Sequence, residues 1–453
     1  MDNIEKSHNL EEFGYKQELR RSMSLSDVVV FGLIYMVPLA PLPVFGLIYN
    51  FSNGMAALVY IVAAIAMVFS AISYAEMAKR YPIAGSVYSY VQKGMNPFIG
   101  FIAGWAILLD YLLLPALLSV FAATAMVTLL PSIPAWVWVI AFVILAAIIN
   151  LRGVKLTAGM NKIFLIIQIV VLGIFVIGAL IALANGQATL SWSPIYQSTD
   201  FNWTIVFGAI PLAALSFIGF DAISTLNEEA KGGGETVSKA TMIVLVVVTI
   251  LFVMQVYLAS IFVPTGTYFA DGNEVNNAFY NLSAQVVAPW FKVVITLTSA
   301  LVAIFANSIA SQATSSRLVF SMARDGKLPK FLAWVNPKTK VPQNSMLFIA
   351  ILSLIIGVTG SAHQGFLTTL VTFGALTAYI LLNLAVLYHF GIAQKSQRFF
   401  AHWISPVLGT AVLGYALWNT EIMTKIIGVG WLLIGIAVAI YFQKKYANIL
   451  LNQ

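Results

Sequence analysis

Four acidic residues stand in or beside long apolar segments, where a carboxylate is costly and therefore informative. Asp110 lies about twelve residues into one such segment, roughly 18 Å of helical rise from its start. Asp221 follows the run 216–220, and Glu228 and Glu229 come two helical turns later. An ionisable residue at bilayer depth costs about 2.5 to 3.5 kcal/mol on insertion, which indicates contact with a substrate or a proton.

The segments that carry these groups are interrupted near their middle. The first, about residues 26 to 49, contains Gly32 and Pro38, and a proline ends a helix because it lacks an N–H and clashes with the preceding turn. The second, about residues 203 to 230, places Gly219 just before Asp221. Unwound backbone offers free N–H and C=O groups, so a pair of breaks one half-protein apart is typical of a transporter's substrate site.

Composition fixes the class of protein. Of the 453 residues, 60% are hydrophobic and 9% charged, with a mean hydropathy of +0.90, which indicates an integral membrane protein. Apolar stretches of about twenty residues favour helices over a barrel. The twelve predicted spans are about 26–49, 54–78, 98–129, 134–151, 160–184, 203–230, 239–264, 286–320, 343–359, 364–391, 403–420 and 424–443.

Basic residues concentrate in alternate connections, which predicts that both termini are cytoplasmic. The same bias accounts for the net charge of +7, so nucleic acid is not an expected partner, whereas membrane lipid is. We predict a cytoplasmic tail over 1–25 with no cleaved leader, a five-helix repeat over 26–184, an inverted repeat over 203–391, and two additional helices over 403–443. The additional helices could pack at the periphery or in a dimer contact.

Catalysis and metal binding find little support in the chain. There are no cysteines, and the four histidines are scattered near segment ends without the spacing of a metal site. We find no nucleophile with a base at membrane depth. The sequence therefore predicts that the protein is not an enzyme and has neither a metal site nor a cofactor.

Three motifs, in order, resemble the amino acid–polyamine–organocation (APC) superfamily of secondary transporters. They are the residues 23–32, Tyr81-Pro82-x-Ala84-Gly85-Ser86-x-Tyr88, and Ser216-Phe217-x-Gly219-Phe220-Asp221-Ala222. The resemblance implies an all-α fold of twelve transmembrane helices with a LeuT-like five-plus-five inverted repeat and broken helices 1 and 6. Within the superfamily, the residues 104–115 and 225–229 look most like bacterial proton-dependent putrescine importers, which implies import of putrescine or a similar diamine across the cytoplasmic membrane.

One departure from the superfamily bears on the substrate. Amino-acid members present a Gly-small-Gly stretch at the first break, where bare N–H groups hold the substrate carboxylate. Here bulky residues follow Gly32, which favours an amine without a carboxylate, although an amino-acid permease or exchanger stays the alternative. The predicted substrate-binding residues are Tyr35, Asp110, Tyr111, Ser216, Phe217, Ile218, Gly219, Phe220, Asp221 and Glu228.

A diamine needs two acceptor clusters. We expect the carbonyls of 216–219 to bind one ammonium group and Asp110 with Glu228 to bind the other, helped by the Tyr111 hydroxyl. Alternatives stay open: Asp221 could only cap the second half-helix, Glu228 and Glu229 could neutralise basic loops, and Tyr111 could only pack between helices. The aromatic rings of Tyr35, Phe217 and Phe220 could line the methylene chain, with Phe217 acting as a gate or as core.

The coupling ion is the second open point. Some proton-coupled amino-acid members carry a lysine on span 5, where this chain places Gln168, which cannot titrate. Ser308 and Ser311 could help to hold sodium, although hydroxyls are also common in helix packing. We prefer a proton, leave sodium open, and keep Gln168, Glu229, Ser308 and Ser311 as candidate coupling or gate residues.

Overall fold

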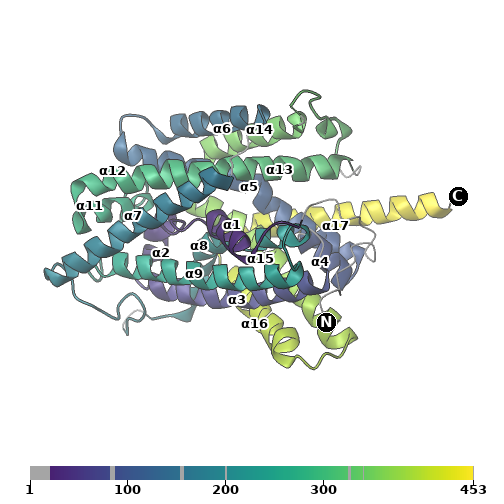
Figure 1. The fold of residues 1–453 in the computed structure, drawn as a ribbon, viewed down its shortest axis with the longest axis horizontal. Helices are drawn as coiled ribbons and strands as arrows, with labels where there is room; N and C mark the ends of the chain where they lie inside the picture. Colours follow the sequence, from purple (N-terminus) through teal and green to yellow (C-terminus); the bar gives the residue numbers. More distant parts are fainter. Residues whose placement is uncertain are drawn as a thin grey trace.

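Helices form the whole membrane-spanning part of the computed structural model, which describes residues 21–81, 87–153, 158–198, 201–324, 328–339 and 341–451 (Figure 1). Within these ranges, ten helical segments are long and apolar enough to cross a membrane. They are α3 (Ala56–Arg80), α5 (Pro97–Leu129), α7 (Ala158–Ala184), α8 with η3 (Trp203–Phe217, Asp221–Glu228), α9 (Gly234–Ser260), α12 with η4 and α13 (Pro289–Leu297, Thr298–Phe305, Ala306–Arg324), α14 (Gln343–Gly360), α15 with η6 (Gln364–Val386, Leu387–Ala393), η7 with α16 (Phe400–Ile404, Ser405–Trp418), and α17 (Ile422–Leu451).

Two further spans are shorter or broken. Span 4 is α6 (Ala135–Leu151), and span 1 consists of α1 (Leu25–Met36), the 3-10 turn η2 (Leu42–Val44) and α2 (Phe45–Phe51). The count of twelve spans predicted from sequence is therefore confirmed. Short helices also occur outside the spans: α4 (Val87–Gly94), η5 (Lys330–Ala333), α10 (Asn273–Asn276) and α11 (Ala278–Val286).

Both predicted breaks are present. Helix α1 stops at Met36, and Val37 has a φ of 54°, which is rare for a β-branched residue. Val37 precedes Pro38, and a proline disfavours the helical conformation in the residue before it. Helix α8 stops at Phe217, and Gly219 has a φ of +121°, a conformation that L side chains rarely adopt. The chain then continues as the 3-10 helix η3, so broken helices 1 and 6 are confirmed.

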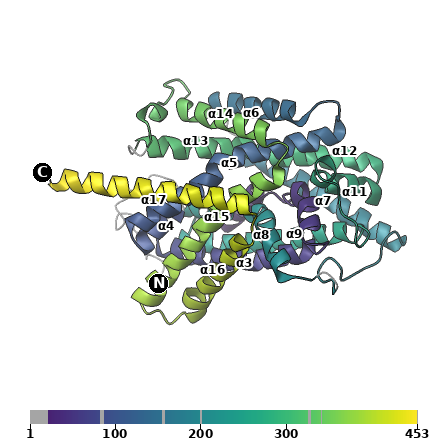
Figure 2. The same ribbon diagram turned by 180° about the vertical axis from the view of Figure 1, so that it is seen from behind.

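The spans form two groups. Helices α5, α6, α13 and α14 contact one another, and α1, α3, α8 and α9 form the second group. In Figure 1 the first group lies along the top and α3 and α9 lie along the bottom, with α1 and α8 between them; Figure 2 shows the same layers from behind. The breaks thus lie at the boundary between the two groups.

The contacts follow the pattern of an inverted repeat. Span 5 (α7) packs on span 1 and on η4 of span 8, and span 10 (α15) correspondingly packs on span 6 (α8) and on span 3 (α5). Exchanging spans 1–5 with spans 6–10, each for its counterpart, converts the first set of contacts into the second. The LeuT-like arrangement is confirmed, whereas the boundaries of the repeats at 26–184 and 203–391 stay a prediction.

A proline inside α5 connects span 3 to span 8. Pro115 cannot donate to the carbonyl of Tyr111 four residues earlier. The hydroxyl of Ser315, on α13, donates to that carbonyl instead. In the membrane interior such a freed acceptor needs a partner from a neighbouring helix. The exchange fixes α13 against α5 beside Asp110.

Aromatic side chains fill the space around α2, on the far side of the breaks from α4. Phe45 contacts Phe269 and Phe279 edge to face, and Phe279 also contacts Phe175. Asn50 donates from its side chain to the Phe269 carbonyl at 2.7 Å and accepts from the Phe269 N–H at 3.0 Å. The loop after α9 is thereby fixed across this end of the molecule.

Spans 11 and 12 pack on the outside of the repeats. Helix α16 contacts α3, α8 and α15, and α17 contacts α5 and α15. Trp105 and Trp431 stack at 4.7 Å, and each indole N–H donates to the backbone carbonyl of the other at 2.8 Å. Beyond this contact α17 projects past the bundle at the end where α4 lies (Figure 1). The peripheral packing is observed within the single chain, and the dimer contact stays untested.

Candidate substrate site

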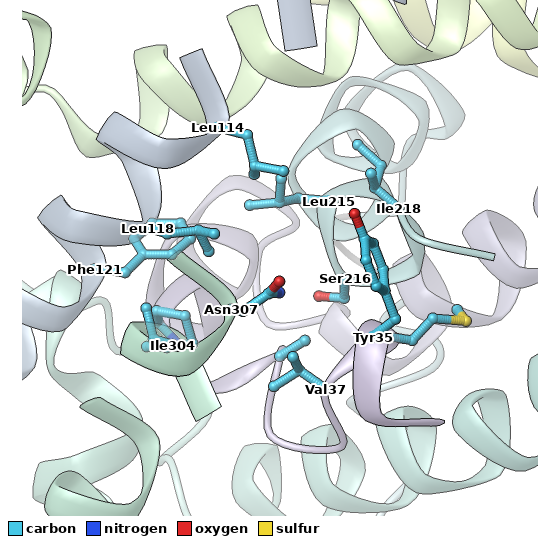
Figure 3. A pocket seen from close by; sticks show the side chains of 13 residues that line it. Tyr35, Val37, Leu114, Leu118, Phe121, Leu215, Ser216, Ile218, Ile304 and Asn307 are labelled. Atoms are coloured by element: carbon cyan, nitrogen blue, oxygen red, sulfur yellow. The ribbon is translucent and has the colours of Figure 1, made fainter. Parts of the chain in front are cut away.

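A small cavity of about 60 Å³ lies between the two breaks. Figure 3 shows Ser216 and Asn307 reaching into this space beside Tyr35, with apolar side chains around them. The lining residues are Tyr35, Met36, Val37, Ala40, Pro43, Leu114, Leu118, Phe121, Leu215, Ser216, Ile218, Ile304 and Asn307. A mostly apolar chamber with a few polar groups at one wall is the usual form of a small-molecule site.

A second, larger cavity of about 910 Å³ adjoins the first. We call it the vestibule. Its lining includes residues of α1, α5, α7, η3 and α13 and, in the connections, Gly153, Thr339, Val341 and Pro342. These connections belong to the end of the molecule predicted to be cytoplasmic. Tyr35 and Asn307 line both cavities and therefore separate them.

Six residues beside the vestibule form an acidic tyrosine cluster: Tyr35, Tyr74, Asp110, Tyr111, Asp221 and Tyr379. Asp110 and Asp221 are close enough to interact electrostatically, and the four tyrosines interact with both carboxylates. The members come from α1, α3, α5, η3 and α15. Spans distant in the sequence therefore converge at this point.

The two carboxylates differ in their bonding. Asp221 accepts from the Gly219 N–H at 3.1 Å and from the Tyr379 hydroxyl at 3.2 Å. Asp110 is 4% exposed, and its Oδ1 has no hydrogen-bond partner among the described residues. No described lysine, arginine or histidine forms an ion pair with either carboxylate. Neither carboxylate therefore has a described cationic partner that would offset its cost at membrane depth.

Aromatic rings surround this charge. Phe220, Tyr74 and Tyr379 contact one another with ring centroids 5.2 to 5.8 Å apart. Rings of this kind attract a cation at their faces. Asp221 itself is partly exposed and is followed by Ala222, which lines the vestibule.

The end of α8 supplies backbone acceptors. The Ile218 N–H donates to the carbonyls of Ala214 and Leu215, so those of Ser216 and Phe217 extend past the helix end. The Ser216 hydroxyl pairs with the Tyr60 hydroxyl at 2.9 Å. At Gly219, a Cβ would lie 2.7 Å from the ring of Tyr35, so only glycine lets that ring close over the break.

The break after α1 is poor in donors. Pro38, Pro41 and Pro43 have no N–H. The N–H groups of Ala40, Leu42 and Val44 donate to carbonyls within the same turn. Only the Leu39 N–H in the segment 38–44 is left unused by these turns. The backbone of this break therefore offers few free N–H donors.

The other predicted substrate-binding residues are placed as follows. Phe217 packs against Tyr60 and Phe252, and Phe220 packs against Tyr74 and Tyr379; neither is among the residues that line the small cavity or the vestibule. Ile218 and Ser216 line the small cavity, and Tyr111 lines the vestibule. The side chain of Glu228 lies outside the described residues.

The candidate coupling and gate residues are scattered. Gln168 lines the vestibule, 2% exposed, with its Oε1 unpartnered among the described residues. Ser308 bonds to the hydroxyl of Ser119 at 3.3 Å, so it faces α5. Ser311 is buried outside both cavities. The Glu229 carbonyl accepts from the N–H groups of Ser22 and Met23, which attaches the start of the described chain to the end of η3.

Sequence reasoning missed Tyr74, Tyr379 and Asn307. Tyr74 and Tyr379 stand in spans that are apolar all round, so no periodicity shows which face is buried against the site. Asn307 stands among many other polar residues of α13, so its polarity alone does not single it out. Also missed was Glu76 at the end of α3, which pairs with Arg398 and accepts from His402 at 3.1 Å. That pairing joins spans 2 and 11, and its residues line neither of the two cavities.

Comparison with known proteins agrees with this architecture. A family model described as "Amino acid permease" matches residues 22–449. The low-affinity putrescine importer PlaP of Escherichia coli K12 is 31% identical over 98% of both chains. The branched-chain amino acid permease BcaP of Bacillus subtilis is 27% identical over 87% of this chain and 86% of its own, and the methylthioribose transporter of the same organism is 26% identical over 96% of each. The chain belongs to the amino acid permease family of the APC superfamily of membrane transporters.

Proposed function

We propose that this transporter imports putrescine or a similar small diamine across the cytoplasmic membrane by alternating access. The observation that carries the proposal is the pair of interacting carboxylates, Asp110 and Asp221, enclosed by tyrosines. Asp110 is buried and Asp221 is half-buried, and two carboxylates without a described basic partner match a dication in amount and sign. A monovalent zwitterion would bring a carboxylate of its own into the same field.

The order of polar and apolar groups in the site suits a diamine with a short apolar middle. One ammonium group would bind Asp110 and Asp221, reaching them from the vestibule past Tyr35. The methylene chain would lie along the apolar wall that Leu114 and Leu118 form. The second ammonium would bind carbonyls at the end of α8, where Ser216 and Asn307 add polar side-chain oxygens. Each end thus obtains charge-assisted hydrogen bonds.

The position of the vestibule supports release of the substrate on the cytoplasmic side. Its lining includes Gly153, Thr339, Val341 and Pro342, which lie in connections whose basic residues predict a cytoplasmic location. The opposite end is closed by the aromatic contacts of Phe45 and by the Asn50–Phe269 pairing. We assign this conformation to the inward-facing side of the cycle, with both termini in the cytoplasm.

A proton is the proposed coupling ion. Ser308, a candidate sodium ligand, uses its hydroxyl toward Ser119 on α5 and does not line the vestibule. Asp110 and Asp221 are titratable groups at the site itself, so a proton can enter the transport cycle there. Sodium coupling is the contrary outcome of the gradient experiment below.

The test is uptake of radiolabelled putrescine into proteoliposomes that contain the purified chain. We expect concentrative uptake under an inward pH gradient and little stimulation by an inward sodium gradient. Unlabelled ornithine, which adds one carboxylate to putrescine, should compete poorly. Strong competition by ornithine together with no putrescine uptake would refute the diamine assignment.

An amino-acid permease is the second candidate. It is favoured by the likeness to the branched-chain amino acid permeases and by the apolar lining of the small cavity, which could take an aliphatic side chain. Against it stands the first break, where Pro38, Pro41 and Pro43 remove donors that a substrate carboxylate needs. Uptake of labelled leucine that putrescine does not inhibit would favour this candidate.

A further inference from the structure

Tyr74 on α3 carries a buried polar group that the fold does not satisfy. The residue is 2% exposed, and its hydroxyl has no hydrogen-bond partner among the described residues. The Oδ1 atom of Asp110 is in the same condition, and the two residues interact electrostatically. The ring of Tyr74 also packs on Tyr379, whose hydroxyl donates to Asp221. Buried polar groups in native proteins nearly always have partners, so two unpartnered ones in the same cluster indicate a ligand-binding point.

The position of this hydroxyl is fixed by packing. The ring of Tyr74 meets Phe220 at 5.4 Å and 87°, Tyr379 at 5.8 Å and 84°, and Tyr90 at 6.0 Å and 75°. Three edge-to-face contacts hold the ring in one orientation. The hydroxyl is therefore preorganised and need not be ordered when a ligand arrives.

The chemistry of the cluster distinguishes kinds of ammonium group. A primary ammonium has three N–H donors, and Asp110, Asp221 and Tyr74 contribute acceptors of different origin to the cluster. A trimethylated or dimethylated nitrogen keeps the charge but has no donor, or only one, for them. Attraction to the carboxylates would remain, whereas the hydroxyl would be left unsatisfied.

Resting on the proposed function, we infer that Tyr74 is a specificity-determining residue that selects a primary ammonium group over an N-methylated one at the acidic tyrosine cluster. Its hydroxyl accepts a hydrogen bond from the ammonium that Asp110 and Asp221 neutralise. The carboxylates supply affinity for positive charge in general. The hydroxyl supplies the preference among cations of equal charge.

The experiment compares putrescine with N,N,N′,N′-tetramethylputrescine as competitors of labelled putrescine binding to the purified full chain. The wild type should prefer putrescine by at least about tenfold. Tyr74→Phe, which keeps the ring and its contacts, should weaken putrescine about tenfold and tetramethylputrescine by less than about threefold. The control is Tyr280→Phe, whose buried hydroxyl bonds to Ser299 at 2.8 Å away from both cavities; it should leave the ratio unchanged.

The outcomes separate this inference from the function on which it rests. No binding of putrescine by the wild type would overturn the proposed function. Binding of both ligands with equal affinity by the wild type would overturn the inference alone, even if Tyr74→Phe failed to fold. If a folded Tyr74→Phe variant bound both ligands with the same ratio of affinities as the wild type, Tyr74 would be only a packing residue.

Discussion

Replacing Asp110 by asparagine should weaken putrescine binding roughly a hundredfold. The change keeps the size of the side chain and its carbonyl oxygen but removes one of the two charges that face the substrate. Removing one partner of a buried ion pair costs about 3 to 5 kcal/mol. Because Asp221 remains beside the same ammonium group, we expect the lower end, about 3 kcal/mol, which is a factor of roughly 150 in Kd.

Equilibrium binding of labelled putrescine to purified Asp110→Asn is the assay, with thermal unfolding as a check on folding. Asp271→Asn is the matched control, because Asp271 is an exposed carboxylate on the loop after α9. The control should bind as the wild type does. A loss of less than about threefold in a folded Asp110→Asn would show that the substrate does not contact this carboxylate, and the reasoning from the buried charge pair would fail.

Three further predictions concern structure. Ser315→Ala should lower the free energy of unfolding by about 1 to 3 kcal/mol, because it leaves the Tyr111 carbonyl without a donor. The Ser316 hydroxyl bonds within its own helix, so Ser316→Ala should lower the free energy of unfolding by less, and thermal unfolding of both variants tests the difference. Gly219→Ala should cost about 1 to 3 kcal/mol and abolish uptake, because it strains a φ of +121° and displaces Tyr35; wild-type uptake would contradict it. Single cysteines can be placed in this cysteine-free chain and labelled with an impermeant thiol reagent. Cysteines at positions 235, 330 and 395 should react only from the cytoplasm, and those at 188 and 273 only from outside. Labelling of position 235 from outside would contradict the predicted topology.

The sequence predicted the spans and the breaks because these depend on local properties. Hydropathy over about twenty residues identifies a membrane helix, and Pro38 and Gly219 interrupt helices through their own backbone chemistry. Asp110 and Asp221 could be chosen for the same reason, since a carboxylate at depth is rare whatever its neighbours are. The structure places these two close together.

The composition of the site could not be predicted in the same way. Tyr74 and Tyr379 approach Asp221 only through the packing of α3 and α15, and an aromatic residue in an apolar helix has no sequence signal for the direction it faces. Phe217 and Phe220 lie at the break, yet their rings turn into the core. The hydroxyl of Ser308 faces α5, a direction that depends on how α5 and α13 pack around Pro115.

The central claim is that the site binds two ammonium groups, and competition for uptake tests it most directly. Proteoliposomes would take up labelled putrescine under an inward pH gradient in the presence of unlabelled putrescine or butylamine, which has the same chain and one ammonium group fewer. Because butylamine leaves one set of acceptors without its cation, we expect it to compete at least about a hundredfold less well than putrescine. Equal competition by the two amines would contradict the account.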